Sequence, residues 1–187
     1  LSEFFEDLKR LKIQVHRPCI NYCFNEFVVK DDTVFYALAA IKSVGFESIS
    51  LIIDEREKNG KFKSLKDFIN RVNPKNINKL QLEGLVKAGA FDSIFSNRKV
   101  LYDSIPKIIQ ISKNLHENKA ANQTSLFTDD QDKDFFITDD KNLEDWKIEE
   151  KLSKEFNAIG FYVSNHPLNE YKDILNIYSA SSYQDFI

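Results

Sequence analysis

The chain has 187 residues, with 26 Lys and Arg against 29 Asp and Glu, and its formal net charge of −3 does not by itself mark a nucleic-acid-binding protein. Two cysteines provide no disulfide framework, and the sequence has neither a signal-peptide pattern nor an apolar run of membrane-spanning length. These features argue against a disulfide-rich secreted protein and against a membrane protein, so we expect a cytoplasmic location. Because the sequence starts at Leu1 and contains no Met, we also expect it to be a piece of a longer protein.

The charges are unevenly distributed along the chain. Residues 37–110 carry 13 Lys and Arg against 8 Asp and Glu, whereas residues 111–187 carry 8 against 15. The first 36 residues are nearly balanced, with 5 against 6. A basic segment can face a polyanion while an acidic segment stays away from it, so this distribution favours a nucleic-acid contact within residues 37–110.

Residues 1–36 are expected to form one helix followed by a small β element. Ser2 can cap a first helix that has an apolar face. Residues 13–15 have the pattern of a short strand. Residues 27–29 and 33–36 are rich in β-branched and aromatic side chains, and the Lys-Asp-Asp sequence between them suits a turn. The last two segments are therefore predicted to pair as a β-hairpin.

The segment 37–61 has the pattern of two helices joined by a tight turn. A short apolar stretch, 38–41, leads into the turn 42–45, and a periodic amphipathic segment follows. Gly45 suits such a turn because glycine tolerates a positive φ or a close backbone approach without steric cost. Amide groups and the positive dipole end at the start of the second helix can accept a phosphate. The pattern predicts a helix-hairpin-helix element that holds a nucleic-acid backbone and reads no bases; the alternative is an ordinary αα-hairpin.

A similar unit follows about 44 residues later. Gly60 is expected to end the helix that starts after Gly45, and Ser64 to open another that closes before Pro74. Asn78 then opens an apolar helix that ends in a turn at Gly89. The two units can cover each other's apolar faces in one helical domain. For Gly89 the alternative is a plain helix C-cap.

The C-terminal part changes character at residue 116. Residues 97–115 predict a long helix with a kink or break at Pro106. Residues 116–141 are polar and acidic and predict an exposed linker. Within this linker, residues 123–127 form one short amphipathic segment, Gln-Thr-Ser-Leu-Phe. Further helical segments follow in residues 142–187.

These elements predict a mainly α protein, a tandem helix-hairpin-helix helical domain with a small N-terminal β-hairpin element and a C-terminal extension after an acidic linker. The predicted boundaries are 1–36 for the β element, 37–115 for the helical domain, 116–141 for the linker and 142–187 for a helical connector.

Several strings along the chain, taken in order, resemble one family. They cover nearly the whole sequence and are residues 18–21, 36–45, 54–65, 85–92, 123–127 and 155–168. The chain is similar to the C-family replicative DNA polymerases of bacteria, the DNA polymerase III alpha subunits, in the region after the catalytic core. Each string alone is weak, whereas the ordered set is specific.

The resemblance implies a part of a DNA-directed DNA polymerase, a nucleotidyltransferase, that is itself without catalytic residues. The polymerase carboxylates and their magnesium would belong to a palm domain upstream, residues 1–36 would end the fingers region, and an oligonucleotide-binding domain would follow. The implied partners are double-stranded DNA, the sliding clamp (the beta subunit) and other subunits of the polymerase III holoenzyme.

Two sets of site residues follow. The residues expected to bind the DNA backbone are Lys42, Ser43, Val44, Gly45, Phe46, Glu47, Lys58, Lys61, Lys63, Lys87 and Gly89. The residues expected to bind the clamp are Gln123, Leu126 and Phe127. A Leu-Phe pair inside an acidic linker has no core to join, so it can anchor in an apolar pocket of a partner while Gln123 forms a hydrogen bond at the pocket rim. The alternative is that Leu126 and Phe127 dock on their own domain.

No metal or cofactor is expected in this segment. His16, Cys19 and Cys23 lack the second ligand pair of a zinc site, and the cysteines suit small buried positions. Two other functions stay open. A helix-hairpin-helix glycosylase would need a catalytic Lys, such as Lys61 or Lys63, and an Asp such as Asp92. A protein-interaction adaptor would not contact DNA.

Overall fold

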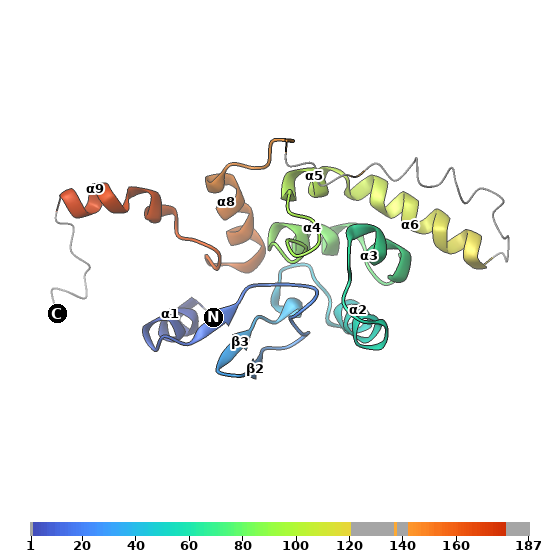
Figure 1. The fold of residues 1–187 in the computed structure, drawn as a ribbon, viewed down its shortest axis with the longest axis horizontal. Helices are drawn as coiled ribbons and strands as arrows, with labels where there is room; N and C mark the ends of the chain where they lie inside the picture. The colour runs from blue at the N-terminus through green and yellow to red at the C-terminus, as the bar shows by residue number, and fades with distance from the viewer. Residues whose placement is uncertain (1, 121–136, 138–141, 179–187) are drawn as a thin grey trace.

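The computed structural model describes residues 2–120, 137 and 142–178, and these residues form a mainly helical protein with a small sheet near the N-terminus (Figure 1). The strands are β1 (Gln14–His16), β2 (Val28–Lys30) and β3 (Thr33–Phe35). The helical elements are α1 (Ser2–Arg10), η1 (Leu38–Ala40), α2 (Phe46–Asn59), α3 (Leu65–Arg71), α4 (Lys79–Lys87), α5 (Arg98–Asp103), α6 (Ile105–Ala120), α8 (Ile148–Ile159), η2 (Pro167–Tyr171) and α9 (Lys172–Ile177). The predicted fold class is confirmed.

β3 is the central strand of the sheet. It pairs with β2 in an antiparallel register and with β1 in a parallel one, so the strand order is β1-β3-β2. Asp31 and Asp32 connect β2 to β3 with φ angles of 47° and 56°. Two consecutive residues with positive φ are typical of a type I′ turn, whose twist matches that of the strands it joins. The predicted hairpin is therefore confirmed, and β1 extends it by a parallel pairing.

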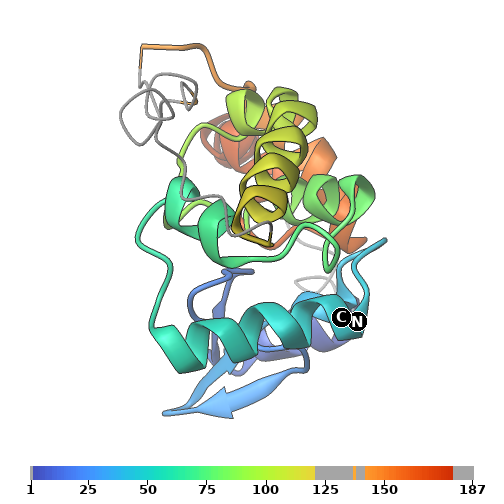
Figure 2. The same ribbon diagram turned by 90° about the vertical axis from the view of Figure 1, so that its right-hand side faces the viewer.

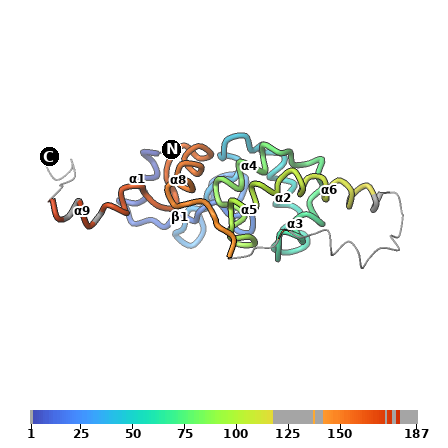
Figure 3. Tube along the Cα trace, turned by 90° about the horizontal axis from the view of Figure 1, so that it is seen from above, coloured from blue at the N-terminus to red at the C-terminus, as the bar shows by residue number. Residues whose placement is uncertain are grey.

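Two layers of structure are visible in Figures 1 and 2. α1, the sheet and α2 form one layer, and α3, α4, α5, α6 and α8 form the other. α4 packs against α5, α6 and α8. Leu38, Ile49 and Leu85 are fully buried in the core that the two layers share. α9 extends away from both layers (Figure 3). Among the described residues, no helix combines the length and the apolar character that crossing a bilayer requires.

The helix starts follow the sequence closely. The Ser64 side chain accepts a hydrogen bond from the Asp67 amide at the start of α3, and Asn78 and Gln81 form a reciprocal capping box at the start of α4. α5 ends at Asp103 and α6 begins at Ile105, so Pro106 lies in the first turn of a new helix. Proline is tolerated there because no intrahelical bond needs its missing amide. The predicted break is confirmed.

The first helix of the 37–61 segment is shorter than predicted. Of the residues of this segment before the turn, only Leu38–Ala40 is helical, and it forms a single 3-10 turn. The Lys42 amide donates to the carbonyl oxygen of Ala158 in α8 at 2.8 Å, whereas an α-helix would need it to donate to Leu38. A contact with a distant part of the chain thus ends this helix before its second turn.

Candidate nucleic-acid interface

The site starts from the N-terminus of α2. Gly45 is its N-cap residue, in an extended conformation with φ of −81° and ψ of 141°, and no described side chain caps the helix. The first amide groups of a helix have no partner inside it, and the positive end of the helix dipole lies there. Phe46 and Glu47 are exposed, as are Lys42 and Ser43 just before them. This end of α2 is thus open to an anion from solvent.

The sequence suggested two reasons for a glycine at position 45, a positive φ or a close backbone approach, and the structure supports only the second. The residue with positive φ in the turn is Ser43, at 66°, and not Gly45. A Cβ on Gly45 would instead stand 3.1 Å from the side-chain Nε2 of Gln81, so close approach is the operative reason. The turn also uses some of its own amides, because Val44 donates to the Ile41 carbonyl oxygen at 3.1 Å. The amides that remain for a ligand are those of the first turn of α2.

Gln81 joins the starts of two helices. Its Oε1 accepts from the Asn78 amide at 2.8 Å, and its Nε2 donates to the Ser48 hydroxyl at 2.8 Å. Ser48 lies in the first turn of α2 and Asn78 is the N-cap residue of α4. The positive dipole ends of α2 and α4 therefore lie next to each other. Two adjacent dipole ends strengthen the attraction of this surface for an anion.

The fold brings together three of the residues that were predicted to bind the DNA backbone, Lys42, Ser43 and Lys87. They line one surface pocket of about 100 Å³ with Leu80, Glu83, Gly84, Asn157 and Ala158. Lys87 is partly engaged, because its Nζ lies 4.0 Å from a carboxylate oxygen of Glu83 and 5.1 Å from the ring centroid of Tyr102. Lys42 is therefore the more accessible ammonium group of the two.

Gly84 is a site residue that the sequence analysis missed. A Cβ on Gly84 would stand 2.8 Å from the carbonyl oxygen of Lys42 and 3.2 Å from a methyl group of Val44. The turn of residues 42–44 thus rests directly on the backbone of α4. The sequence did contain a sign of this contact, because Gly84 lies inside the predicted helix between Asn78 and Gly89, and a glycine inside a helix often has a packing reason.

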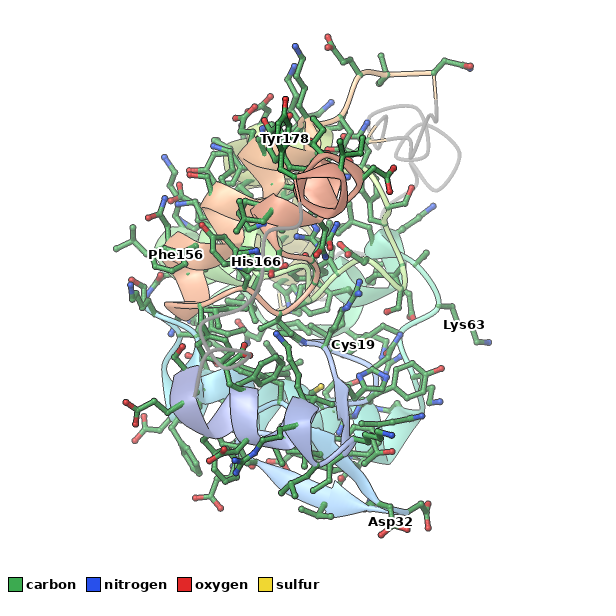
Figure 4. The ribbon with its side chains drawn as sticks, turned by 90° about the vertical axis from the view of Figure 1, so that its left-hand side faces the viewer. Cys19, Asp32, Lys63, Phe156, His166 and Tyr178 are labelled. Atoms are coloured by element: carbon green, nitrogen blue, oxygen red, sulfur yellow. The ribbon has the colours of Figure 1, made fainter. Side chains whose placement is uncertain are left out.

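The other predicted lysines lie at the opposite end of α2. α2 has 14 residues and is therefore about 21 Å long at 1.5 Å per residue. Lys61 lies over the ring of Tyr22, with Nζ 3.8 Å from the centroid, and the exposed Lys63 projects outward in Figure 4. The structure therefore divides the predicted basic set into a group at the hairpin and a second group, with Lys58 in the last turn of α2 and Lys61 and Lys63 in the loop after it.

The loop that carries the second group is fixed by polar contacts. The Asn21 side chain donates to the Phe62 carbonyl oxygen at 2.9 Å and accepts from the Phe62 amide at 2.8 Å. The Arg71 guanidinium donates to the Gly60 carbonyl oxygen at 2.8 Å and to Glu55 at 2.9 Å. The hydrogen bond from Arg71 is the largest cause that holds the pKa of Glu55 below its ordinary value. Lys61 and Lys63 are thus presented from an ordered loop.

Gly89 fits the simpler of its two interpretations. Its φ is 76°, its amide donates to Val86, and the Ala90 amide donates to Leu85, which is the Schellman pattern of a helix C-cap. A Cβ on Gly89 would overlap the guanidinium of Arg98. The second turn is thus buried and its amides are used internally, in contrast to the first.

Arg98 connects this second turn to α8. Its guanidinium contacts Asp92 at 2.6 Å and lies 3.8 Å from a carboxylate oxygen of Glu155. Burial acts to lower the pKa of Arg98, but the hydrogen bonds and charges of these carboxylates raise it overall. Glu155 also accepts hydrogen bonds from the amides of Val163 and Ser164. Since Asp92 is held in this ion pair, it is poorly placed to act as the general base of a glycosylase.

The cysteines and His16 do not assemble a metal site in the part of the chain that is described, where no three potential metal ligands cluster. Cys19 and Cys23 are buried thiols, and burial raises the pKa of Cys23 to about 12. A thiol that stays protonated is a poor metal ligand. The predicted clamp-binding residues Gln123, Leu126 and Phe127 lie outside the described residues.

Comparison with known proteins agrees with this geometry. The helix-hairpin-helix motif family matches residues 12–101. The DNA polymerase III alpha subunit of Borreliella burgdorferi is 41% identical over 96% of this chain, that of Caulobacter vibrioides 34% over 91%, and that of Campylobacter jejuni 30% over 100%. The chain spans only 15% to 16% of the length of these relatives. It belongs to the family of the DNA polymerase III alpha subunits and corresponds to one segment of them.

Proposed function

We propose that this chain is a non-catalytic segment of a bacterial replicative DNA polymerase that holds duplex DNA by its backbone and tethers the enzyme to the sliding clamp. The parent protein would be a DNA-directed DNA polymerase that uses magnesium, assembled with other holoenzyme subunits. Support comes from the names of the relatives, all of them DNA polymerase III alpha subunits, and from the helix-hairpin-helix match.

The uncapped N-terminus of α2 carries the DNA part of this proposal. Its first amides, the exposed Lys42 and Ser43, and the neighbouring start of α4 offer hydrogen-bond donors and positive potential on one small surface. Such donors suit phosphate oxygens and read no base edges. Lys87 would add a weaker contact because Glu83 competes for its ammonium group.

Lys58, Lys61 and Lys63 would form a second, peripheral contact. Lys58 lies in the last turn of α2, and Lys61 and Lys63 lie on the following loop, which Asn21 and Arg71 hold in place. Exposed lysines attract a polyanion through long-range charge, so this group would add to affinity without adding sequence preference.

Clamp binding would be performed by Gln123, Leu126 and Phe127. The supporting observation is the sequence itself, which places two large apolar side chains among Asp129, Asp130 and other acidic residues. Anchoring to a clamp raises the effective concentration of the enzyme at its template, and processivity follows from that increase.

The segment alone is expected to add no nucleotide to a primer. Two-metal phosphoryl transfer needs carboxylates that hold two ions about 4 Å apart, and the sequence offers no strand-borne pair of this kind. Template-dependent extension by the purified chain would disprove this part of the proposal.

A salt titration tests the DNA part. Binding of the chain to two duplexes of unrelated sequence is measured by fluorescence anisotropy between 50 and 200 mM salt. The proposal expects equal affinities for the two duplexes and a linear fall of log affinity with log salt. A marked sequence preference contradicts it, and affinity that does not depend on salt, or no binding at all, favours the adaptor function.

A further inference from the structure

A second surface pocket lies at the far end of α2 and combines aromatic rings with cations. Its lining comes from strands β2 and β3, from the segment between β1 and β2 and from the end of α2 with the two residues after it, and consists of Asn21, Tyr22, Phe24, Lys30, Phe35, Arg56, Glu57, Gly60 and Lys61. Its volume is about 380 Å³, within the range of roughly 300–1,000 Å³ of pockets that hold small organic ligands.

The aromatic residues form one continuous group. The His16 and Phe35 rings are stacked, with centroids 5.1 Å apart and 15° between their planes. Tyr22 lies 5.3 Å from His16, and Phe24 lies 6.2 Å from Phe35 in an edge-to-face arrangement. Tyr22 is 43% exposed. The group therefore presents a ring to solvent on a base of other rings.

Cations cover the faces of these rings. Lys61 Nζ lies 3.8 Å from the centroid of Tyr22, and Lys30 Nζ lies 4.7 Å from that of Phe24. Arg56 also lies over Phe24, at 5.3 Å, but it is buried and donates to the carbonyl oxygens of Ile20 and Cys23 at 2.9 and 2.6 Å. Arg56 is thus a fixed part of the wall, whereas the exposed Lys30 and Lys61 can swing away.

We propose that this pocket binds an unpaired nucleobase of single-stranded DNA, with Tyr22 as the stacking ring and Lys30 and Lys61 on the flanking phosphates. The flat π face of a base can stack on an aromatic ring in place of the lysine ammonium group that covers it. The phosphates on either side of the bound nucleotide then attract the displaced lysines. A base-paired duplex keeps its bases stacked inside and cannot supply this ligand. Glu57 in the lining can accept hydrogen bonds from N–H groups of a base, such as the N3–H of thymine, and repels phosphate, which orients the base inward.

This site is separate from the duplex contact at the hairpin, because it lies at the opposite end of α2, and it shares only Lys61 with the peripheral duplex contact proposed above. It goes beyond the proposed function, and because its test substitutes Tyr22 and not Lys61, it can fail separately. The ligand that it recognises is the single strand that a polymerase segment near a primer–template junction would meet.

The test uses the 187-residue chain and labelled single-stranded oligodeoxythymidine of twelve nucleotides, read by fluorescence anisotropy. Tyr22→Ala and Tyr22→Leu are expected to weaken binding about tenfold, because both remove the π face and Tyr22→Leu keeps apolar bulk. Tyr22→Phe is expected to retain binding within twofold. Tyr171→Ala, which removes an exposed tyrosine of η2, is the matched control and is expected to change nothing.

An abasic oligomer of the same length separates stacking from charge. The wild-type chain is expected to bind it about tenfold more weakly than oligodeoxythymidine, and Tyr22→Ala is expected to cause no further loss. Duplex binding should be the same in Tyr22→Ala and wild type within twofold. The pocket proposal is wrong if Tyr22→Leu binds oligodeoxythymidine as tightly as wild type does. It is also wrong if Tyr22→Leu weakens binding to the abasic oligomer by the same factor as binding to oligodeoxythymidine. Both outcomes are independent of the result at the hairpin. A loss of duplex binding in Lys42→Glu tests the hairpin separately.

Discussion

The carbonyl oxygen of Lys42 lies 2.8 Å from the point where a Cβ on Gly84 would stand. The turn that precedes α2 therefore packs against the bare backbone of α4, and the two helix starts are held side by side by Gln81. A side chain at position 84 would push the turn away from α4. The geometry of the candidate phosphate site thus depends on one glycine that lies outside the turn itself.

Gly84→Ala tests this dependence. In an open helix the change would stabilise the protein by about 1 kcal/mol through helix propensity. Here the new methyl group meets a backbone carbonyl that cannot move alone, so we expect a loss of roughly 1–3 kcal/mol in unfolding free energy. Urea unfolding measures it, with Ser153→Ala on the exposed face of α8 as control. A Gly84→Ala variant that is more stable than wild type would show that the contact is looser than described.

Gly89 and Gly160 form a natural pair for a second test. Both have positive φ, at 76° and 97°, but only Gly89 has a neighbour that a Cβ would strike. Gly160→Ala should cost about 1 kcal/mol, the usual strain of a left-handed residue. Gly89→Ala should cost at least about 1 kcal/mol more, since it displaces Arg98 from Asp92 and Glu155. Equal losses in the two variants would mean that Arg98 adapts freely.

Tyr36 gives a prediction that depends on pH. Its side chain is fully buried, and its hydroxyl has no hydrogen-bond partner among the described residues. Burial raises the pKa of Tyr36 from 10.0 to about 12. The neutral phenol is favoured in the folded state, so this contribution to stability is complete below pH 10 and is lost as pH rises toward 12.

Tyr36→Phe removes the hydroxyl and should leave stability at pH 7 unchanged or raise it by up to about 1 kcal/mol. It should also reduce the loss of stability between pH 7 and pH 10.5. Urea unfolding at the two pH values measures both effects. The pKa of Cys23 is raised from 9.0 to about 12, so Cys23 adds a loss of stability that begins near pH 9 in both proteins, and the comparison is therefore between variant and wild type. A clearly destabilised Tyr36→Phe would indicate a hidden partner for the hydroxyl.

The double variant Leu126→Ala, Phe127→Ala tests clamp binding. Burying each of these side chains in a partner would contribute roughly 1.5–3 kcal/mol before the cost of ordering the segment. We therefore expect at least about a tenfold loss of affinity for the bacterial sliding clamp, measured by titration calorimetry, with no change in thermal midpoint. Unchanged affinity would contradict the assignment. A lowered thermal midpoint would mean that the two residues belong to the core of the chain.

Local rules predicted much of this fold. The caps at Ser64 and Asn78, the Asp31-Asp32 turn and the break before Pro106 each depend on a few neighbouring residues, and the sequence displays those residues directly. The apolar periodicity of α2 was clear for the same reason. For the site, this local information was enough to predict a turn at residues 42–45 followed by a helix whose first amide groups are available to an anion.

Long-range contacts set the rest, and no local pattern contains them. The Lys42 amide bonds to Ala158, which turns an expected helix into a single 3-10 turn. Arg56 and Arg98 look like surface cations in the sequence, yet both are buried by partners from distant segments. The grouping of Lys42 with Lys87, and the separation of both from Lys61, likewise follows from how α2 lies across the other layer (Figure 2).

The central claim is that the hairpin at the start of α2 holds DNA phosphates, and Lys42→Glu measured against Lys113→Glu tests it most directly. Both lysines are exposed, and both changes alter the net charge equally, but Lys113 lies on α6 and outside either basic group. With duplex DNA at 100 mM salt, we predict that Lys42→Glu weakens binding about threefold to tenfold and lowers the salt slope by about 1, whereas Lys113→Glu changes affinity by less than twofold. Equal losses in the two variants would show that only overall charge matters and would contradict a phosphate site at the hairpin.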